Sequence, residues 1–111
     1  MKTTIMAAIA ALLMLSAVPT FAADADLSSQ ISAAKTAADH EALAGAYDKQ
    51  AAEAEATAAA HDKMAASYKG LGKTGQMHGT HCAGIAKRER ENAKDLKALA
   101  AAERAAAKAA K

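Results

Sequence analysis

Apolar and small side chains recur every three or four residues through the middle of this chain, with charged side chains between them. One row of the repeat reads His40, Tyr47, Ala54, His61 and Tyr68, and a second reads Leu43, Gln50, Thr57, Met64 and Leu71. A third row of alanines, seven residues apart from Ala44 to Ala65, flanks them. Seven-residue spacing is typical of a helix that packs along a narrow seam. The pattern predicts one long helix from about residue 36 to 69, with a partly polar seam.

A glycine-rich segment ends this helix. Gly70, Gly72 and Gly75 fall within six residues, and glycine is common where a helix stops and the chain turns. A loop over 70–75 and a second helix over about 76–109 are therefore predicted. The expected seam of that helix reads His78, Cys82, Ile85, Glu89, Asn92, Leu96, Leu99 and Glu103.

The start of the first long helix is open to two interpretations. Thr36 and Asp39 are spaced like a capping box, which favours a helix that begins there. Leu27 and Ile31 are four residues apart, which favours either a separate short helix or one helix that runs through from Ser28.

Two long helices joined by a short loop lie antiparallel, so the sequence predicts an all-α hairpin with a possible short helix before it. Folding about Lys73 places Tyr68 level with His78 and Met64 level with Cys82. In the same register His40 lies near Glu103 and Ala106, which predicts a contact between His40 and Glu103, with a second metal site at His40 as the alternative. Two hairpins that pair would form a four-helix bundle, so we expect a homodimer.

The N-terminal residues have the features of a secretory signal. Lys2 supplies a positive charge, residues 5–15 form an apolar run, and Thr20-Phe21-Ala22 places small residues at both cleavage-site positions. The apolar run is too short to span a bilayer permanently. We therefore expect cleavage after Ala22, a periplasmic or secreted domain over 23–111, and no stable membrane insertion afterwards.

Composition limits the functions open to this domain. Without residues 1–22 the formal charge is +1 and the acidic and basic residues are interleaved, which does not favour nucleic-acid binding. Alanine supplies 30 of the remaining 89 residues. Because alanine favours helix but buries little area, a monomer would have a thin core that a metal or a partner chain could stabilise.

Residues able to bind a metal gather in the run Met77-His78-Gly79-Thr80-His81-Cys82. In a helix, its two histidines and its cysteine lie at i, i+3 and i+4 and so share one face. The hairpin register brings further donors from the first helix to the same end. The predicted metal ligands are Cys82, His78, His81, Met64 and His61. Thiolate, thioether and imidazole groups favour copper as Cu(I), then zinc, over calcium or magnesium. A metal buffer, sensor or carrier is the first function we expect.

The same residues also have an ordinary structural explanation. Seam histidines can be packing residues, Met64 can fill the core, and Cys82 can be a buried thiol or link two chains. The protein would then be an alanine-rich coiled coil that spaces components of the cell envelope and contacts an envelope protein. We expect no enzyme, because a two-helix seam offers little cleft for a Cys–His nucleophile. The chain also has neither a haem-attachment motif nor a wide apolar pocket for haem.

Three runs of the chain carry a resemblance to known proteins. His40-Glu41-Ala42-Leu43-Ala44, His61-Asp62-Lys63-Met64-Ala65-Ala66-Ser67-Tyr68 and His81-Cys82 resemble a group of small, secreted, alanine-rich bacterial proteins. The resemblance covers most of residues 23–111 and implies an exported helical hairpin without a particular activity. In architecture the chain is also similar to periplasmic metal-resistance and copper-handling proteins that use histidine and methionine on antiparallel helices.

Overall fold

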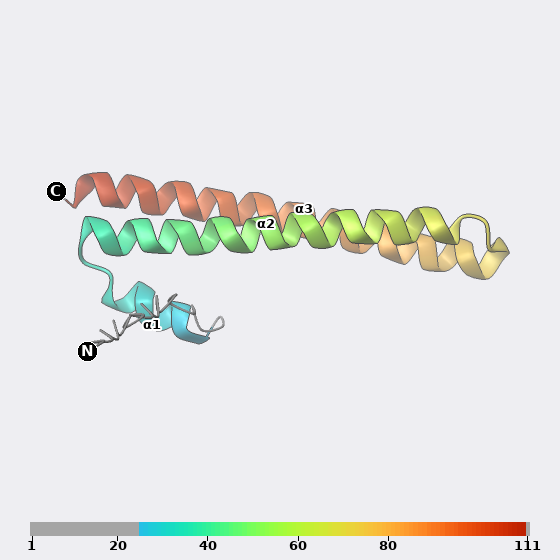
Figure 1. Ribbon diagram of the computed structural model, residues 1–111, viewed down its shortest axis with the longest axis horizontal. Coiled ribbons are helices and arrows are strands. Elements are labelled where there is room, and N and C mark those ends of the chain that lie inside the picture. The colour runs from blue at the N-terminus through green and yellow to red at the C-terminus, as the bar shows by residue number, and fades with distance from the viewer. Residues whose placement is uncertain (1–24, 111) are drawn as a thin grey trace, which may run out of the picture.

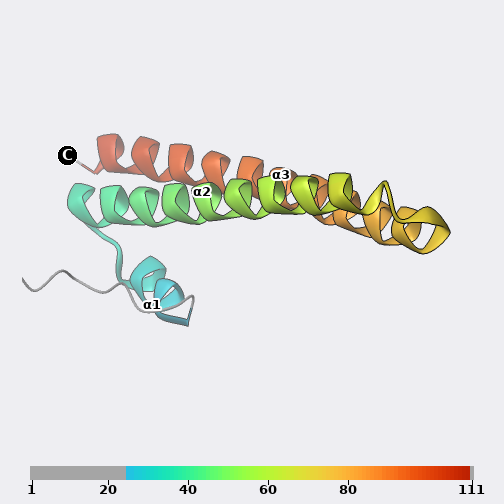
Figure 2. The same cartoon turned by 45° about the vertical axis from the view of Figure 1, so that its right-hand side comes forward.

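The computed structural model describes residues 25–110, and these form three helices and no strand (Figure 1). Helix α1 spans Ala25–Ala33, α2 spans Ala37–Tyr68 and α3 spans Gly72–Ala109. Figures 1 and 2 show α2 and α3 side by side along their length, with α1 folded back beside the start of α2. The prediction of an all-α hairpin with a short first helix is confirmed. The predicted signal segment, residues 1–22, lies outside the described residues. None of the described helices combines the length and hydropathy needed to cross a bilayer.

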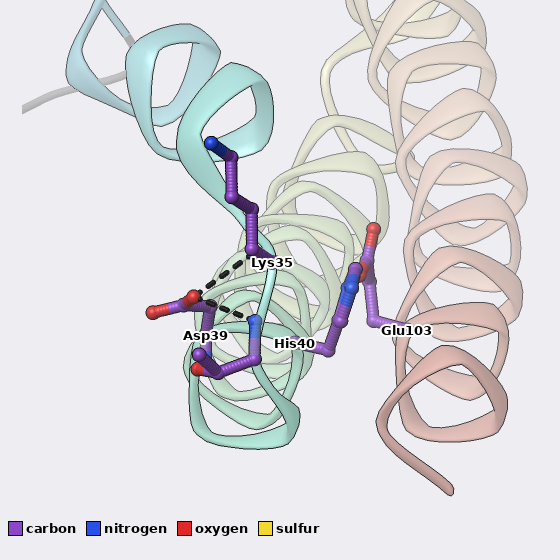
Figure 3. A network of polar contacts seen from close by, with 5 residues as sticks. Lys35, Asp39, His40 and Glu103 are labelled. Carbon is purple, nitrogen blue, oxygen red and sulfur yellow. Dashed lines mark hydrogen bonds and ion pairs between the residues drawn. The ribbon is translucent and has the colours of Figure 1, made fainter. Parts of the chain in front are cut away.

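A capping box starts α2. The Thr36 hydroxyl oxygen accepts a hydrogen bond from the Asp39 backbone N–H at 3.1 Å. The Asp39 carboxylate accepts hydrogen bonds from the backbone N–H groups of Thr36 at 2.9 Å and Lys35 at 3.0 Å (Figure 3). These bonds satisfy donors that a helix start leaves unpaired. Helices α1 and α2 are therefore separate, and the interpretation of one helix running through from Ser28 is wrong.

The turn between α2 and α3 is tighter than the glycines indicated. Residues 69–71 form it, and α3 begins at Gly72, four residues before the expected start. Gly72 has φ +72°, a conformation that residues other than glycine rarely adopt. Gly75 is buried, and a Cβ there would clash with the Tyr68 carbonyl oxygen and lie 2.6 Å from Leu71 Cβ. These two glycines let α3 start directly against the end of α2.

The smallest side chains form the centre of the seam between α2 and α3. The most deeply buried alanines are seven residues apart on each helix, and none is more than 4% exposed: Ala44, Ala51 and Ala58 on α2, and Ala86, Ala93, Ala100 and Ala107 on α3. The predicted seam is wrong in part, because Leu99 is 45% exposed and Met64 is 41% exposed. Alanine lets two helices approach closely, so the larger side chains lie beside the contact rather than at its centre.

Ion pairs line one side of this seam. Asp48, Glu55 and Asp62 on α2 pair with Arg104, Lys97 and Arg90 on α3, respectively. All six side chains are about half exposed, between 44% and 57%. Each such pair contributes about 0–1 kcal/mol, so the row fixes the relative orientation of the helices more than it stabilises them.

The other side of the seam carries the predicted contact between His40 and Glu103. The His40 Nδ1 atom lies 2.7 Å from a Glu103 carboxylate oxygen, and the two side chains are 22% and 21% exposed (Figure 3). Leu27 of α1 packs against the neighbouring buried cluster that contains Tyr47 and Ala100. The first helix therefore helps to cover the hairpin at the end away from the loop.

Candidate metal centre

All five predicted ligands lie at the loop end of the hairpin. His61 and Met64 belong to the last turns of α2, and His78, His81 and Cys82 belong to the first turns of α3. The donor groups therefore lie at one end of the hairpin. Whether they can bind one metal ion together depends on which of them face one another.

Two contacts hold the His78 side chain in place. Its Nδ1 atom lies 2.6 Å from the backbone carbonyl oxygen of Thr74, which can only accept, so Nδ1 carries the proton. The ring also stacks on Tyr68, with centroids 5.1 Å apart and planes inclined by 26°. This stack confirms the predicted level of Tyr68 with His78. The Nε2 atom then keeps its lone pair, and histidines that bind metals typically donate their other N–H in this way.

The heptad repeat places His61 within about one helical turn of the level of Cys82, next to the position expected for Met64. Three heptads along α2 from His40 lead to His61, and three heptads back along α3 from Glu103 lead to Cys82. Antiparallel helices of equal rise keep about this register, but the His61 Nδ1 atom makes no hydrogen bond to Cys82, in contrast to the bonded His40–Glu103 pair. The seam therefore brings one imidazole and one thiol to about the same level.

The His61 ring has an unsatisfied nitrogen at this level. Its Nδ1 atom is buried and has no hydrogen-bond partner among residues 25–110. The equivalent atom of His40 has Glu103 as its partner. Cys82 is partly buried and forms no disulfide within the described part of the chain. A buried imidazole nitrogen without a partner is costly, and a bound metal ion is one group that would satisfy it.

The remaining predicted ligands lie on the surface. His81 is exposed, as are Met64 at 41% and Met77 at 58%. Within the described residues, no group of three or more His, Cys, Asp or Glu side chains is placed to hold a metal ion. A complete coordination shell would therefore require exposed side chains to rotate.

The donors differ from those that hard cations require. No Asp or Glu occurs between Lys63 and Arg88, so carboxylate oxygens are absent from this stretch of the sequence. Sulfur and imidazole nitrogen remain, which suit copper and zinc and not calcium or magnesium. The donor groups of the loop end are therefore of the types that soft or borderline metal ions prefer.

Sequence reasoning missed the role of Thr74. The predicted helix began at about residue 76, so Thr74 was assigned to the loop, and its carbonyl group had no defined partner. The signal was the four-residue spacing of Thr74 and His78, which has meaning only once α3 extends back to Gly72.

Comparison with known proteins found no family model, curated protein or solved structure that matches this chain. The function is therefore argued from the residues of the chain itself.

Proposed function

We propose that this is an exported metal-binding protein that holds a soft or borderline ion, Cu(I) before Zn(II), at the loop end of a helical hairpin. The observation that supports it best is the His78 ring, which the Thr74 carbonyl and Tyr68 hold with Nε2 as its free acceptor. The protein acts in the periplasm or outside the cell as a buffer, carrier or sensor, and it catalyses no reaction.

Each predicted ligand has a distinct part in this proposal. Cys82 supplies the thiolate and His78 the Nε2 donor, four residues apart on one face of α3. His81 is the neighbouring donor on the same helix, and α2 supplies His61 or Met64. Because thiol and imidazole must lose their protons to bind, affinity falls as the pH is lowered.

The proposal predicts tight Cu(I) binding that depends on two residues of α3. Reduced protein, residues 23–111, is titrated with Cu(I) without oxygen against a chromogenic chelator, and Zn(II) is tested in parallel. We expect stoichiometric binding, reduced by about tenfold or more in H78A/C82S, because metal affinity depends on every ligand.

The matched control is H40Q, which removes the one histidine that lies away from the loop end and keeps a hydrogen-bonding group toward Glu103. Unchanged affinity in H40Q together with loss in H78A/C82S assigns the site. If neither Cu(I) nor Zn(II) competes with the chelator, or if C82S alone binds as tightly as the native chain, the proposal fails.

A second candidate is a structural module of the cell envelope, and the composition of the seam favours it. No polar or charged side chain is classed as buried among residues 25–110, and the hairpin packs along α2 and α3 mainly through alanine, with Leu43 and Tyr47 also buried. Such a rod folds without a metal and pairs with a second copy or an envelope protein. Helicity and oligomeric state, measured by circular dichroism and analytical ultracentrifugation, would then be the same with and without a chelator.

A further inference from the structure

Charge is strongly segregated along the hairpin, although the whole chain is nearly balanced. The stretch from Lys63 to Arg88, which includes the turn, contains five basic residues and none of the twelve acidic residues of the chain. All five basic side chains are exposed: Lys63, Lys69, Lys73, Lys87 and Arg88. The acidic residues lie on either side of this stretch, from Asp62 back along α2 and from Glu89 onward along α3, and in the N-terminal part of the chain. The loop end is therefore a basic surface.

Large apolar side chains are exposed on the same surface. Leu71 in the turn is 65% exposed, and Met77 in the second turn of α3 is 58% exposed. With Met64, they are three of the five large hydrophobic side chains exposed in the described part of the chain. Basic and apolar groups together are the composition of a surface that binds the interface of a membrane.

A groove lies between two of these lysines. It has a volume of about 640 Å³, with Lys69, Lys73, Gln76 and Thr80 among its lining residues and glycine and alanine for the remainder. The first turn of α3 carries no acidic side chain, and no side chain caps its free N–H groups. The partial positive charge of that helix end adds to the charge of the lysines.

We propose that the loop end docks on the surface of a bilayer that contains anionic phospholipids. The lysines lie at the headgroups, and Leu71 and Met77 enter the interface without spanning it. A soluble polyanion would contact the lysines and leave these two apolar side chains in water. A lipid surface contacts the lysines with its headgroups and buries the apolar side chains in its interface. The proposal is independent of metal binding, since it depends on Lys69, Lys73, Leu71 and Met77, none of which is a predicted ligand.

Sedimentation with vesicles tests the contribution of charge. Residues 23–111, which contain all three helices, are mixed with vesicles of phosphatidylcholine alone or of phosphatidylcholine and phosphatidylglycerol in equal parts. We expect binding only to the second, and K69Q/K73Q should lower the partition coefficient about 20- to 30-fold, since one basic residue near such a surface changes it about fivefold. The control K94Q/K108Q removes the same charge from exposed positions in the C-terminal half of α3 and should leave binding within about twofold, because those positions lie beyond the screening length from the turn.

A second pair of variants tests the apolar contribution. L71S places a good capping residue at the N-cap of α3, so it preserves the fold, and we expect it to weaken binding several-fold. L99S removes a similarly exposed leucine far from the turn and should bind as the native chain does. Circular dichroism establishes that all four variants keep their helices.

Three outcomes would overturn the proposal. They are no binding to the anionic vesicles, equal weakening in the loop-end and control variants, and binding to heparin at the same salt concentration without binding to vesicles. The last would assign the basic surface to a soluble polyanion.

Discussion

At the scale of single residues, Asp39 links the stability of the protein to pH. Hydrogen bonds from the backbone N–H groups of Lys35 and Thr36 hold the pKa of Asp39 below its ordinary value. A carboxylate with a lowered pKa stabilises the folded chain above its unfolded pKa, about 3.9. That contribution is lost as the pH falls through the lower pKa of the folded state.

We therefore expect D39A to unfold at a lower temperature than the native chain at neutral pH, with the difference shrinking once the native carboxyl is protonated. Thermal unfolding followed by circular dichroism over a series of pH values, from neutral downward, measures this. The control D95A removes an exposed carboxylate from the interior of α3. An effect of D39A that is the same at every pH value would contradict the assignment.

At the scale of helices, glycine has opposite effects in α2 and at the start of α3. Gly45 lies on the exposed face of α2 with open space around it, so G45A should raise the free energy of unfolding by about 0.5–1 kcal/mol. At Gly75 the added methyl group meets the Tyr68 carbonyl, so G75A should lower it by about 1–3 kcal/mol. Urea unfolding of the two variants measures both changes in the free energy of unfolding. Stabilisation by G75A would mean that the packing around Gly75 is looser than described.

The helices were largely predictable because their signals are local. The seven-residue spacing and the Thr36–Asp39 pair are properties of neighbouring residues, so the sequence contains them directly. The start of α3 was not predictable in this way. Three glycines favour a loop by propensity, yet Gly75 lies inside α3 and Gly72, with its positive φ, is the first residue of α3, so that Gly70 alone of the three is in the turn.

The centre of the seam was assigned incorrectly for a different physical reason. Large apolar side chains were taken to mark the line of closest contact, and on α3 this selected Leu99 instead of its neighbour Ala100. The closest contact of these helices instead requires the smallest side chains, so Ala100 is fully buried while Leu99 remains 45% exposed.

At the scale of the whole molecule, two contacts between distant residues fix the register of α2 against α3. The His40–Glu103 pair does so near the open end, and the Tyr68–His78 stack does so at the turn. Both were predictable, because two helices with the same rise that leave a tight turn keep the same level to within about one helical turn. The alanine rows could not have chosen a register, since they repeat identically every seven residues.

We expect the His40–Glu103 pair to be coupled energetically across the hairpin. In a double-mutant cycle of H40A, E103A and H40A/E103A, urea unfolding should give an interaction free energy of about 1 kcal/mol. The exposed Asp48–Arg104 pair is the matched comparison and should give no more than half of this, because solvent screens it. Equal interaction free energies in the two pairs would show that the partial burial of His40 and Glu103 does not strengthen their interaction.

The candidate metal centre was only partly predictable from the sequence. Sequence spacing places residues level along two helices, and it put His78 beside Tyr68 correctly. Spacing does not predict the direction in which an exposed side chain points. The exposure of His81 and Met64 therefore could not be predicted from it. The charge segregation at the loop end was hidden by the near-neutral total, because net charge carries no information about position.

The repeating alanine seam also makes the length of the hairpin adjustable in fixed steps. Removing residues 52–58 together with 91–97 takes one heptad from each helix and one ion pair, Glu55–Lys97, from its side. Ala65 and Ala100 then move into the vacated seam positions, and the molecule is shorter by about 10 Å, the rise of seven helical residues. The capped start of α2 and the turn before α3 remain as they were. The distance between the two ends of the protein can therefore change by paired insertion or deletion of whole heptads, while the chemistry at each end is preserved.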